Sequence, residues 1–171
     1  MELREITLND ISKLQQIANE IYYQIFTDYW TENGLILYIK DIFSKNSLEK
    51  ELNSSNYLYK FIVVKKEVIG FVKVNFTSSN DLSILDNCEL EKIYISPSFN
   101  RRGIGKKVIS EVVKYSRLKS KKLLFLCVMD TNKNAIEFYN NLGFKFYNKT
   151  QLGDYYFKEE FRGMNRMYLK L

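Results

Sequence analysis

A basic glycine turn is the stretch of the sequence whose residue types and spacing point most directly to chemistry. Gly103 and Gly105 stand one residue apart, flanked by the cations Arg101, Arg102 and Lys106. Glycine lets the backbone approach a ligand closely and adopt dihedral angles that other residues resist. A helix that begins here presents unpaired N–H groups at the positive end of its dipole. Together these features predict a binding site for a phosphate or pyrophosphate group.

Two familiar phosphate-binding loops do not match this turn. The dinucleotide-binding fingerprint requires a third glycine where this sequence has Val108. A Walker A loop has four residues between its glycines and a serine or threonine after its lysine, whereas Lys107 follows Lys106 here. The sequence therefore predicts a phosphate site of another type.

A second motif lies further along the chain. The strand expected before the turn ends in Ile-Tyr-Ile-Ser-Pro at residues 93–97, and residues 132–144 read Asn-x-x-Ala-x-x-x-Tyr-x-x-x-Gly-Phe. With both motifs in this order, the chain resembles the GNAT superfamily of acetyl-CoA-dependent N-acetyltransferases. The resemblance covers nearly the whole chain in the order of its elements and is most specific over residues 89–144.

The resemblance implies that acetyl-CoA is the cofactor. Backbone groups of the strand at residues 93–95 are expected to pair with the pantetheine arm, residues 101–106 to wrap the pyrophosphate, and residues 132–135 to form a second cofactor segment. In this family the fourth and fifth strands splay apart and the cofactor enters the gap. The cofactor-binding residues that the resemblance implies are Ile93, Tyr94, Ile95, Arg101, Arg102, Gly103, Ile104, Gly105, Lys106, Asn132, Lys133, Asn134, Ala135 and Tyr139.

Two residues are candidates for moving protons. A primary amine with a pKa of about 10 must lose a proton before it attacks, and a leaving thiolate with a pKa of about 8.5 must gain one. The resemblance places Tyr139 opposite the sulfur as the donor, and we expect Glu91 to be the base, directly or through a water. The alternatives are that Glu91 only positions structure or substrate and that Tyr139 is a core aromatic. Cys127 as an acetylated nucleophile is disfavoured because buried cysteines are mostly inert.

The acceptor is inferred from a narrower resemblance. The tyrosine- and acid-rich segment 22–32, the strand Leu-Glu-Lys-Ile-Tyr-Ile and the helix Asn-Ala-Ile-Glu-Phe-Tyr are similar to those of bacterial PaiA-like polyamine acetyltransferases. A polycation requires carboxylates, and the expected substrate-binding residues are Asp28, Tyr29, Glu32, Glu89 and Glu91. Two interpretations of segment 28–34 remain open: it is an interhelix turn whose aromatic rings pack into the core, or it forms part of the rim of the substrate site.

Composition excludes several kinds of active site. The chain has no histidine and two cysteines, so it cannot build a Ser-His-Asp or Cys-His nucleophile, a histidine-containing zinc site or a four-thiolate zinc site. No metal is expected. The net charge is +6, and nine Lys or Arg residues lie between Arg101 and Lys122 against the single acid Glu111. This run is consistent with a solvated helix face or with a phosphate-rich cofactor, and less so with nucleic acid.

Other functions remain open at this point. A protein N-terminal or lysine acetyltransferase is the nearest rival enzyme, and a non-catalytic module that senses acetyl-CoA is the rival of another class. We expect a small-molecule amine as partner, with no nucleic acid and no membrane, and the sequence allows a homodimer. The charged N-terminus has no apolar signal region, and the longest apolar run, Leu123 to Met129, is too short to span a bilayer. A reducing, cytoplasmic setting is expected.

The elements that must position these residues follow from periodicity. We expect one domain over residues 1–171 with a three-layer α-β-α arrangement around one mixed, mostly antiparallel sheet of about seven strands, in the order β-αα-βββ-α-β-α-ββ. Helices are expected at 9–27, 35–43, 48–52, after the glycine turn and at 132–139. Strands are expected at 2–6, 57–64, 68–76, 88–95, 123–129, 144–149 and 165–171, with a loop at 77–86.

Overall fold

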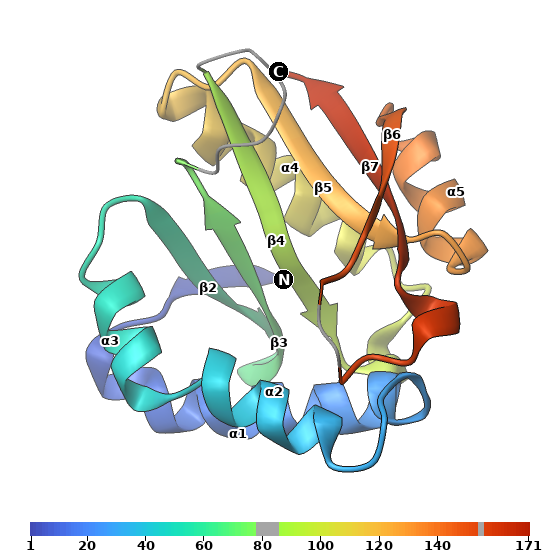
Figure 1. Cartoon of the computed structure of the whole chain (residues 1–171). Helices are drawn as coiled ribbons and strands as arrows, with labels where there is room; N and C mark the ends of the chain where they lie inside the picture. Colours follow the sequence, from blue (N-terminus) through green and yellow to red (C-terminus); the bar gives the residue numbers. More distant parts are fainter. Residues whose placement is uncertain (78–85, 154–155) are drawn as a thin grey trace.

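Seven strands form one mixed sheet in the computed structural model, which describes residues 1–77, 86–153 and 156–171 (Figure 1). The order across the sheet is β1-β2-β3-β4-β5-β7-β6, and neighbours are antiparallel except for the parallel pair β4 and β5. This arrangement confirms the expected fold class. The strands are β1 Glu2–Glu5, β2 Tyr57–Val64, β3 Glu67–Asn75, β4 Asn87–Ile95, β5 Leu123–Met129, β6 Lys145–Gln151 and β7 Gly163–Lys170.

Helices cover both faces of the sheet (Figure 1). One face carries α1 Ile11–Phe26, α2 Gly34–Ile42 and α3 Lys45–Leu52, and the other carries α4 Ile104–Leu118 and α5 Lys133–Asn141. The predicted chain order is confirmed from β2 onward. Between β1 and β2 the structure has three α-helices where the predicted order has two, and the third, α3, contains the short helix expected at 48–52. In the described residues no helix is both long and apolar enough to cross a bilayer. Most of the loop predicted at 77–86 lies outside the described residues.

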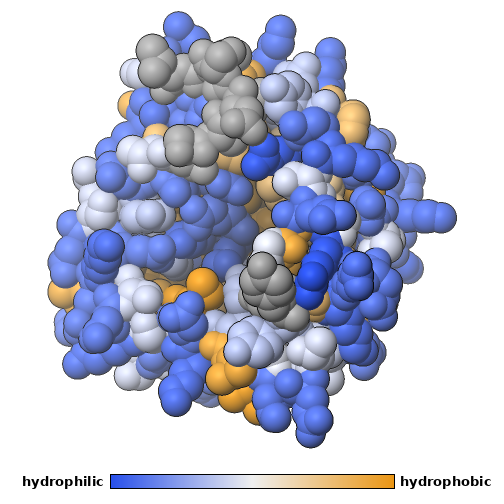
Figure 2. All heavy atoms as spheres, in the orientation of Figure 1, coloured by the Kyte–Doolittle hydropathy of each residue, from blue (hydrophilic) through white to orange (hydrophobic). Residues whose placement is uncertain are grey.

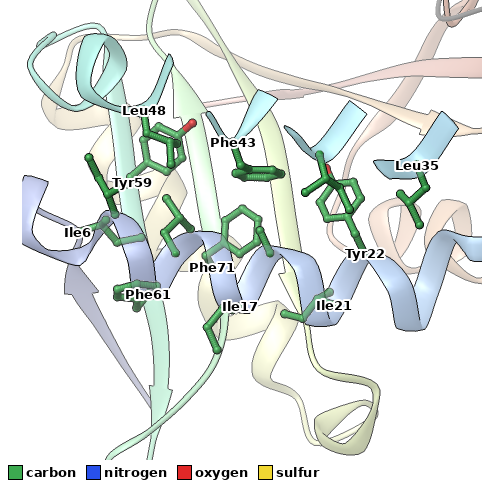
Figure 3. Packing of buried hydrophobic residues seen from close by; sticks show 14 of the residues in the cluster. Ile6, Ile17, Ile21, Tyr22, Leu35, Phe43, Leu48, Tyr59, Phe61 and Phe71 are labelled. Carbon is green, nitrogen blue, oxygen red and sulfur yellow. The ribbon is translucent and has the colours of Figure 1, made fainter. Parts of the chain in front are cut away.

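Two apolar cores result, one on each face of the sheet. Strand β3 shows how a single strand serves both, because its side chains alternate between faces. Phe71 packs into the core beneath α1 and α2, together with Phe43 and Tyr22 (Figure 3). Val72 and Val74 pack into the core beneath α4. The sheet is therefore packed against helices on both of its faces.

A capping box fixes the short 3-10 helix Leu8–Asp10, which leads into α1. The backbone N–H of Thr7 donates to Asp10 Oδ2 at 3.0 Å, and the Thr7 hydroxyl donates to the same oxygen at 2.9 Å. Arg4 Nη1 donates to Asp10 Oδ1 at 3.1 Å. Burial by itself raises the pKa of the Asp10 carboxyl, but its bonds with Thr7 and its pairing with Arg4 outweigh burial and lower that pKa. The cap therefore depends on an ionised Asp10.

Strands β4 and β5 separate partway along their length, as the resemblance implied. They pair only where residues Asn87 to Glu89 face Leu123 to Phe125. Beyond these three pairs the two strands are not hydrogen-bonded to each other, although β4 remains paired with β3 and β5 with β7. The sheet thus opens at its centre while both halves stay intact.

Candidate active site

A cavity of ≈ 830 Å³ lies at the opening between β4 and β5. Its lining comes from six parts of the chain: the end of α1, strand β4, the glycine turn, strand β5, helix α5 with its N-cap, and the start of strand β7. Figure 2 shows a hollow near the centre of the molecular face that carries α2 and α3, with mostly hydrophilic residues around it. Of the residues predicted to bind the cofactor, those that line the cavity are Ile93, Tyr94, Ile95, Arg101, Gly103, Ile104, Gly105, Lys106, Asn132, Asn134, Ala135 and Tyr139.

The glycine turn has the geometry of an anion site. Arg101 and Gly103 both have positive φ, at 59° and 72°, and Gly103 is the N-cap of α4. The N–H of Lys107 donates to Gly103 O at 3.3 Å, so the N–H groups of the three preceding residues belong to the first turn, which has no intrahelical acceptors. A Cβ built on Gly103 would meet no protein atom within 4 Å, which leaves open space over the turn.

Arg102 and Lys133 are the two predicted cofactor residues that do not line the cavity. Arg102 is used within the turn itself: its Nη2 donates to Ser98 O at 3.0 Å and its guanidinium lies 5.0 Å from the centre of the Phe99 ring. Lys133 is exposed at the start of α5. The charge over the open turn therefore comes from Arg101 and Lys106.

The second motif forms the other wall of the cavity. Asn132 caps α5, because its Oδ1 accepts the Ala135 N–H at 3.1 Å. This cap sets the direction of the helix that carries Tyr139, whose ring lies 5.2 Å from that of Phe138 and 5.5 Å from that of Phe144. Burial raises the pKa of Tyr139 to about 12. The phenol is therefore protonated at neutral pH.

A β-bulge in β4 orients Glu91. Lys73 of β3 pairs with Lys92, but the next residue, Val74, pairs with Leu90, so Glu91 is an additional residue in β4. Leu90 packs in the core beneath α4, whereas Lys92 Nζ donates to Tyr38 Oη of α2 at 3.2 Å. Glu91 and Lys92 consequently lie on the same face of the sheet, toward α2 and α3.

Both oxygens of Glu91 are held by protein donors. Asn75 Nδ2 donates to Oε1 at 2.9 Å, and Lys73 Nζ lies 2.6 Å from Oε2. Glu91 also lines the cavity. The carboxylate is therefore fixed in orientation at the wall where the two strands part, and each oxygen keeps a second lone pair for another donor.

The other residues predicted to bind the acceptor lie outside the cavity lining. The ring of Tyr29 stacks on Phe157 and contacts Phe161, which agrees with the reading of segment 28–34 as a turn that pads the core. The backbone oxygen of Asp28 accepts from Lys158 Nζ at 2.7 Å. Glu32 borders a separate hollow of ≈ 240 Å³ between α1 and α2. Glu89 pairs with Phe125 in the last hydrogen-bonded step between β4 and β5.

Cys127 also lines the cavity, on β5. Burial, and then the nearby Glu89, raise the pKa of its thiol more than Arg166 lowers it. A raised pKa keeps the sulfur as a thiol at neutral pH, and a thiol is a poor nucleophile. The structure therefore gives no support to an acetylated cysteine.

Several residues of the cavity wall were not predicted. The sequence identified β5 as a strand covered on both faces, but its unbroken apolar run gave no signal of which residues would face a gap. The sequence also gave no signal that Phe138 would face the cavity, because an aromatic residue on a helix usually packs into a core. Those not predicted are Ile25, Phe26, Leu90, Phe99, Asn100, Leu126, Val128, Met129, Phe138 and Met164. Across the described residues, no group of three or more His, Cys, Asp or Glu side chains could hold a metal ion.

Comparison with known proteins agrees with this geometry. Residues 13–144 match the model of the acetyltransferase (GNAT) family. An uncharacterised N-acetyltransferase of Lactobacillus delbrueckii subsp. lactis is 24% identical over 144 residues, which is 84% of this chain and 83% of that protein. A spermidine N(1)-acetyltransferase of Thermoplasma acidophilum is 24% identical over 149 residues, which is 85% of this chain and 88% of that protein.

Among solved structures, the PaiA N-acetyltransferase of Thermoplasma acidophilum in complex with coenzyme A superposes with a TM-score of 0.79. The two chains are 22% identical, and the superposition covers 99% of this chain and 98% of the other. At this level of identity the similarity shows a shared fold.

Proposed function

Because the chain belongs to the acetyltransferase (GNAT) family, which transfers acetyl groups from acetyl-CoA, we propose that it acetylates a primary amine of a polyamine such as spermidine or spermine. One observation carries the proposal. A single cavity between the separated strands β4 and β5 is lined by the glycine turn, by Glu91 and by Tyr139. An anion site, a fixed carboxylate and a protonated phenol are what acetyl transfer to an amine requires.

The residues present fit acetyl-CoA. The open space over Gly103 and the free N–H groups of the first turn of α4 suit a diphosphate, with Arg101 and Lys106 as counter-charges. The unpaired edge of β4 at residues 93–95 is available to the amide groups of the pantetheine arm, and Asn132, Asn134 and Ala135 form the facing wall. Acetyl-CoA would supply the acetyl group as a thioester.

Two side chains would move protons in opposite directions. Glu91 accepts the proton that the substrate ammonium must lose before its nitrogen can attack. Tyr139 donates its phenolic proton to the departing sulfur, since its pKa of about 12 leaves it protonated at neutral pH. The new bond is carbon to nitrogen and the broken bond is carbon to sulfur. The ammonium nitrogen loses two protons on becoming an amide: one goes to Glu91 before attack, and the second goes to the Tyr139 phenolate once that residue has protonated the sulfur.

The charge at the acceptor side favours a cationic amine. Behind Glu91 lies a second carboxylate, Glu51, and one ammonium, Lys73, stands between them. The three side chains together carry a net charge of −1, and Glu91 is the member of the group that lines the cavity, although the whole chain carries +6. Together with the similarity to a spermidine acetyltransferase, this local excess of negative charge supports a polyamine.

Turnover of a panel of amines tests the proposal. The purified protein is given acetyl-CoA with spermidine, spermine, butylamine, free lysine or a peptide with a free N-terminus, and the released thiol and the acetylated product are measured. We expect the highest kcat/KM with the polyamines. A peptide as the best acceptor would instead identify a protein acetyltransferase, equal rates with all amines would end the polyamine proposal, and coenzyme A binding without any product would identify a sensing module.

A further inference from the structure

A buried ion-pair network stands behind Glu91. Lys73 Nζ lies 2.6 Å from Glu91 Oε2 and 2.7 Å from Glu51 Oε1. The Lys73 side chain is 6% exposed, and each of the two glutamate side chains is 22% exposed. The ammonium also lies 4.8 Å from the centre of the Tyr57 ring and 5.5 Å from that of Tyr59. A lysine this deeply buried is stable as a cation only with such partners.

The network connects three elements of the fold. Glu51 is on α3, Lys73 is on β3 and Glu91 is the additional residue of β4. At the far end the Tyr59 hydroxyl donates to Glu51 Oε2, and at the near end Asn75 Nδ2 donates to Glu91 Oε1 at 2.9 Å. Every charged group in the network therefore has partners that fix its position.

The charges that face Glu91 come from several elements. Within the described residues, Lys73 is the cation whose nitrogen lies at ion-pair distance from the Glu91 carboxylate. The neighbouring Lys92 is directed to Tyr38 instead. The titratable groups of the network and its surroundings are Tyr38 on α2, Glu51 on α3, Tyr57 and Tyr59 on β2, Lys73 on β3, and Glu91 and Lys92 on β4.

We propose that Lys73 is a positioning residue for acetyl transfer: by binding Glu51 and Glu91 at once, it stands between the two carboxylates and holds Glu91 directed into the cavity. The inference rests on the proposed function, in which Glu91 accepts the proton of the amine. Lys73 itself touches neither the amine nor the thioester in this role. Its effect is electrostatic, because an adjacent cation favours the charged form of a carboxylate.

Removing the cation has a predictable consequence. In Lys73→Met two carboxylates would share a mostly buried site without a counter-charge, and such pairs retain one proton to a higher pH. A protonated Glu91 cannot accept the proton of the amine. The acidic limb of the pH profile of kcat/KM should therefore move to higher pH in this variant.

The test measures that profile with spermidine for a set of variants. We expect the acidic limb to move up by about one pH unit or more in Lys73→Met, and Lys73→Arg, which keeps the charge, to move it less. Adding Glu51→Gln to Lys73→Met removes the like charge and should return the limb toward the wild-type position. In the single variant Glu51→Gln, Lys73 pairs with Glu91 as its one remaining carboxylate. The acidic limb should then move in the opposite direction, to lower pH.

Lys60→Met is the matched control. Lys60 is also a buried strand lysine, 8% exposed, and it pairs with Glu5 at 3.3 Å outside the cavity lining. Its loss should leave the acidic limb unchanged. If Lys73→Met fails to fold, Lys73→Arg and Glu51→Gln still give displacements of predicted direction. The proposal is overturned if the profiles of the folded Lys73 and Glu51 variants superimpose on the wild-type profile.

A readout without substrate separates this inference from the proposed function. The carboxyl carbon of Glu91 can be followed by 13C NMR during a pH titration, with Glu91→Gln identifying its signal. Glu91 should take up its proton at higher pH in Lys73→Met than in the wild type. An unchanged titration overturns the role of Lys73 even if acetyl transfer is confirmed, and a displaced titration supports it even if polyamines prove not to be the acceptors.

Discussion

Tyr139 and Glu91, the two residues proposed to move protons, have opposite surroundings. The Tyr139 ring is enclosed by apolar neighbours, which disfavour the charged phenolate. The Glu91 carboxylate contacts the Lys73 ammonium and the Asn75 amide, which bind one oxygen each. At neutral pH Tyr139 therefore holds its proton, and the oxygens of Glu91 are held in place by two donors.

Replacing Tyr139 by phenylalanine removes the donor and keeps the ring packing. We expect kcat to fall by about 10²- to 10⁴-fold, the usual contribution of a general acid, while the affinity for coenzyme A stays the same. Steady-state rates with acetyl-CoA and calorimetry with coenzyme A measure the two effects. An unchanged kcat would leave Tyr139 as a core aromatic.

The ionisation of Tyr139 gives a direct check on its surroundings. Its pKa of about 12 means that the phenol holds its proton at every pH below this value and loses it only above. We therefore expect the tyrosinate absorbance of the wild type minus that of Tyr139→Phe to appear near pH 12. Appearance of this difference signal near the ordinary pKa of about 10 would show that the ring is not enclosed.

At the scale of single elements, the capping box of the 3-10 helix that leads into α1 makes a stability prediction. Replacing Asp10 by alanine should lower the free energy of unfolding at pH 7 by about 1 kcal/mol, because the capping box is lost. Folding lowers the pKa of Asp10 below its ordinary value of 3.8, so the carboxylate contributes fully above that pH and loses its contribution as the pH falls through the lower folded-state value. Denaturant unfolding of both proteins at several pH values should show their difference shrinking in acid.

The glycine turn before α4 can be tested without disturbing the packing. Gly103→Ala puts a methyl group over the turn, where it meets no protein atom within 4 Å. We expect the Kd for coenzyme A to rise by roughly tenfold or more, since one hydrogen bond to a charged group contributes about 1.5–3 kcal/mol. The positive φ of Gly103 adds a folding cost of about 1 kcal/mol, so binding is measured where the variant is fully folded.

Gly153→Ala is the control for this substitution. A Cβ at Gly153 also meets no atom within 4 Å, and Gly153 lies outside the cavity lining. Its affinity for coenzyme A should equal that of the wild type. Equal affinities of all three proteins would show that the turn does not hold the diphosphate.

The elements themselves were largely predictable from the sequence. Period-2 and period-3.6 patterns located the strands and helices to within a few residues, because each pattern records which faces are buried. The divergence of β4 from β5 and the cofactor residues came instead from the family resemblance. Local signals predicted correctly what depends on neighbours in the chain, such as the helix that begins at the glycine turn.

Contacts between distant residues were not predictable in the same way. The bulge at Glu91 appears only when β3 and β4 are paired, and Glu51 meets Lys73 across 22 positions of sequence. Tyr29 was predicted to bind the acceptor because it lies among acids, but its ring packs against Phe157, more than a hundred positions away in the printed sequence. Composition shows which side chains are available, but contacts between residues far apart in the sequence depend on the fold.

For the whole molecule, the cavity joins elements from both halves of the sheet, so its ligand should stabilise the entire fold. Coenzyme A at about 100 times its Kd should raise the free energy of unfolding by about 2.7 kcal/mol. For a chain of this size, that corresponds to an increase in Tm of roughly 5–10 °C. Thermal unfolding with and without coenzyme A measures the shift, and adenosine without phosphates serves as the control. No increase in Tm at saturating coenzyme A would contradict the assignment of this cavity.

The bulge in β4 also divides the residues of this strand into those that pack the two cores and the one that is proposed to act in the reaction. Leu90 packs on the side of α4, Lys92 on the side of α2, and Ile93 again on the side of α4. Without the residue between Leu90 and Lys92, these three side chains would follow plain alternation and keep the same neighbours. Glu91 thus stands outside the alternation that builds the two cores. The extra residue places a carboxylate at the opening between the strands, and the same carboxylate serves as a partner of the buried Lys73.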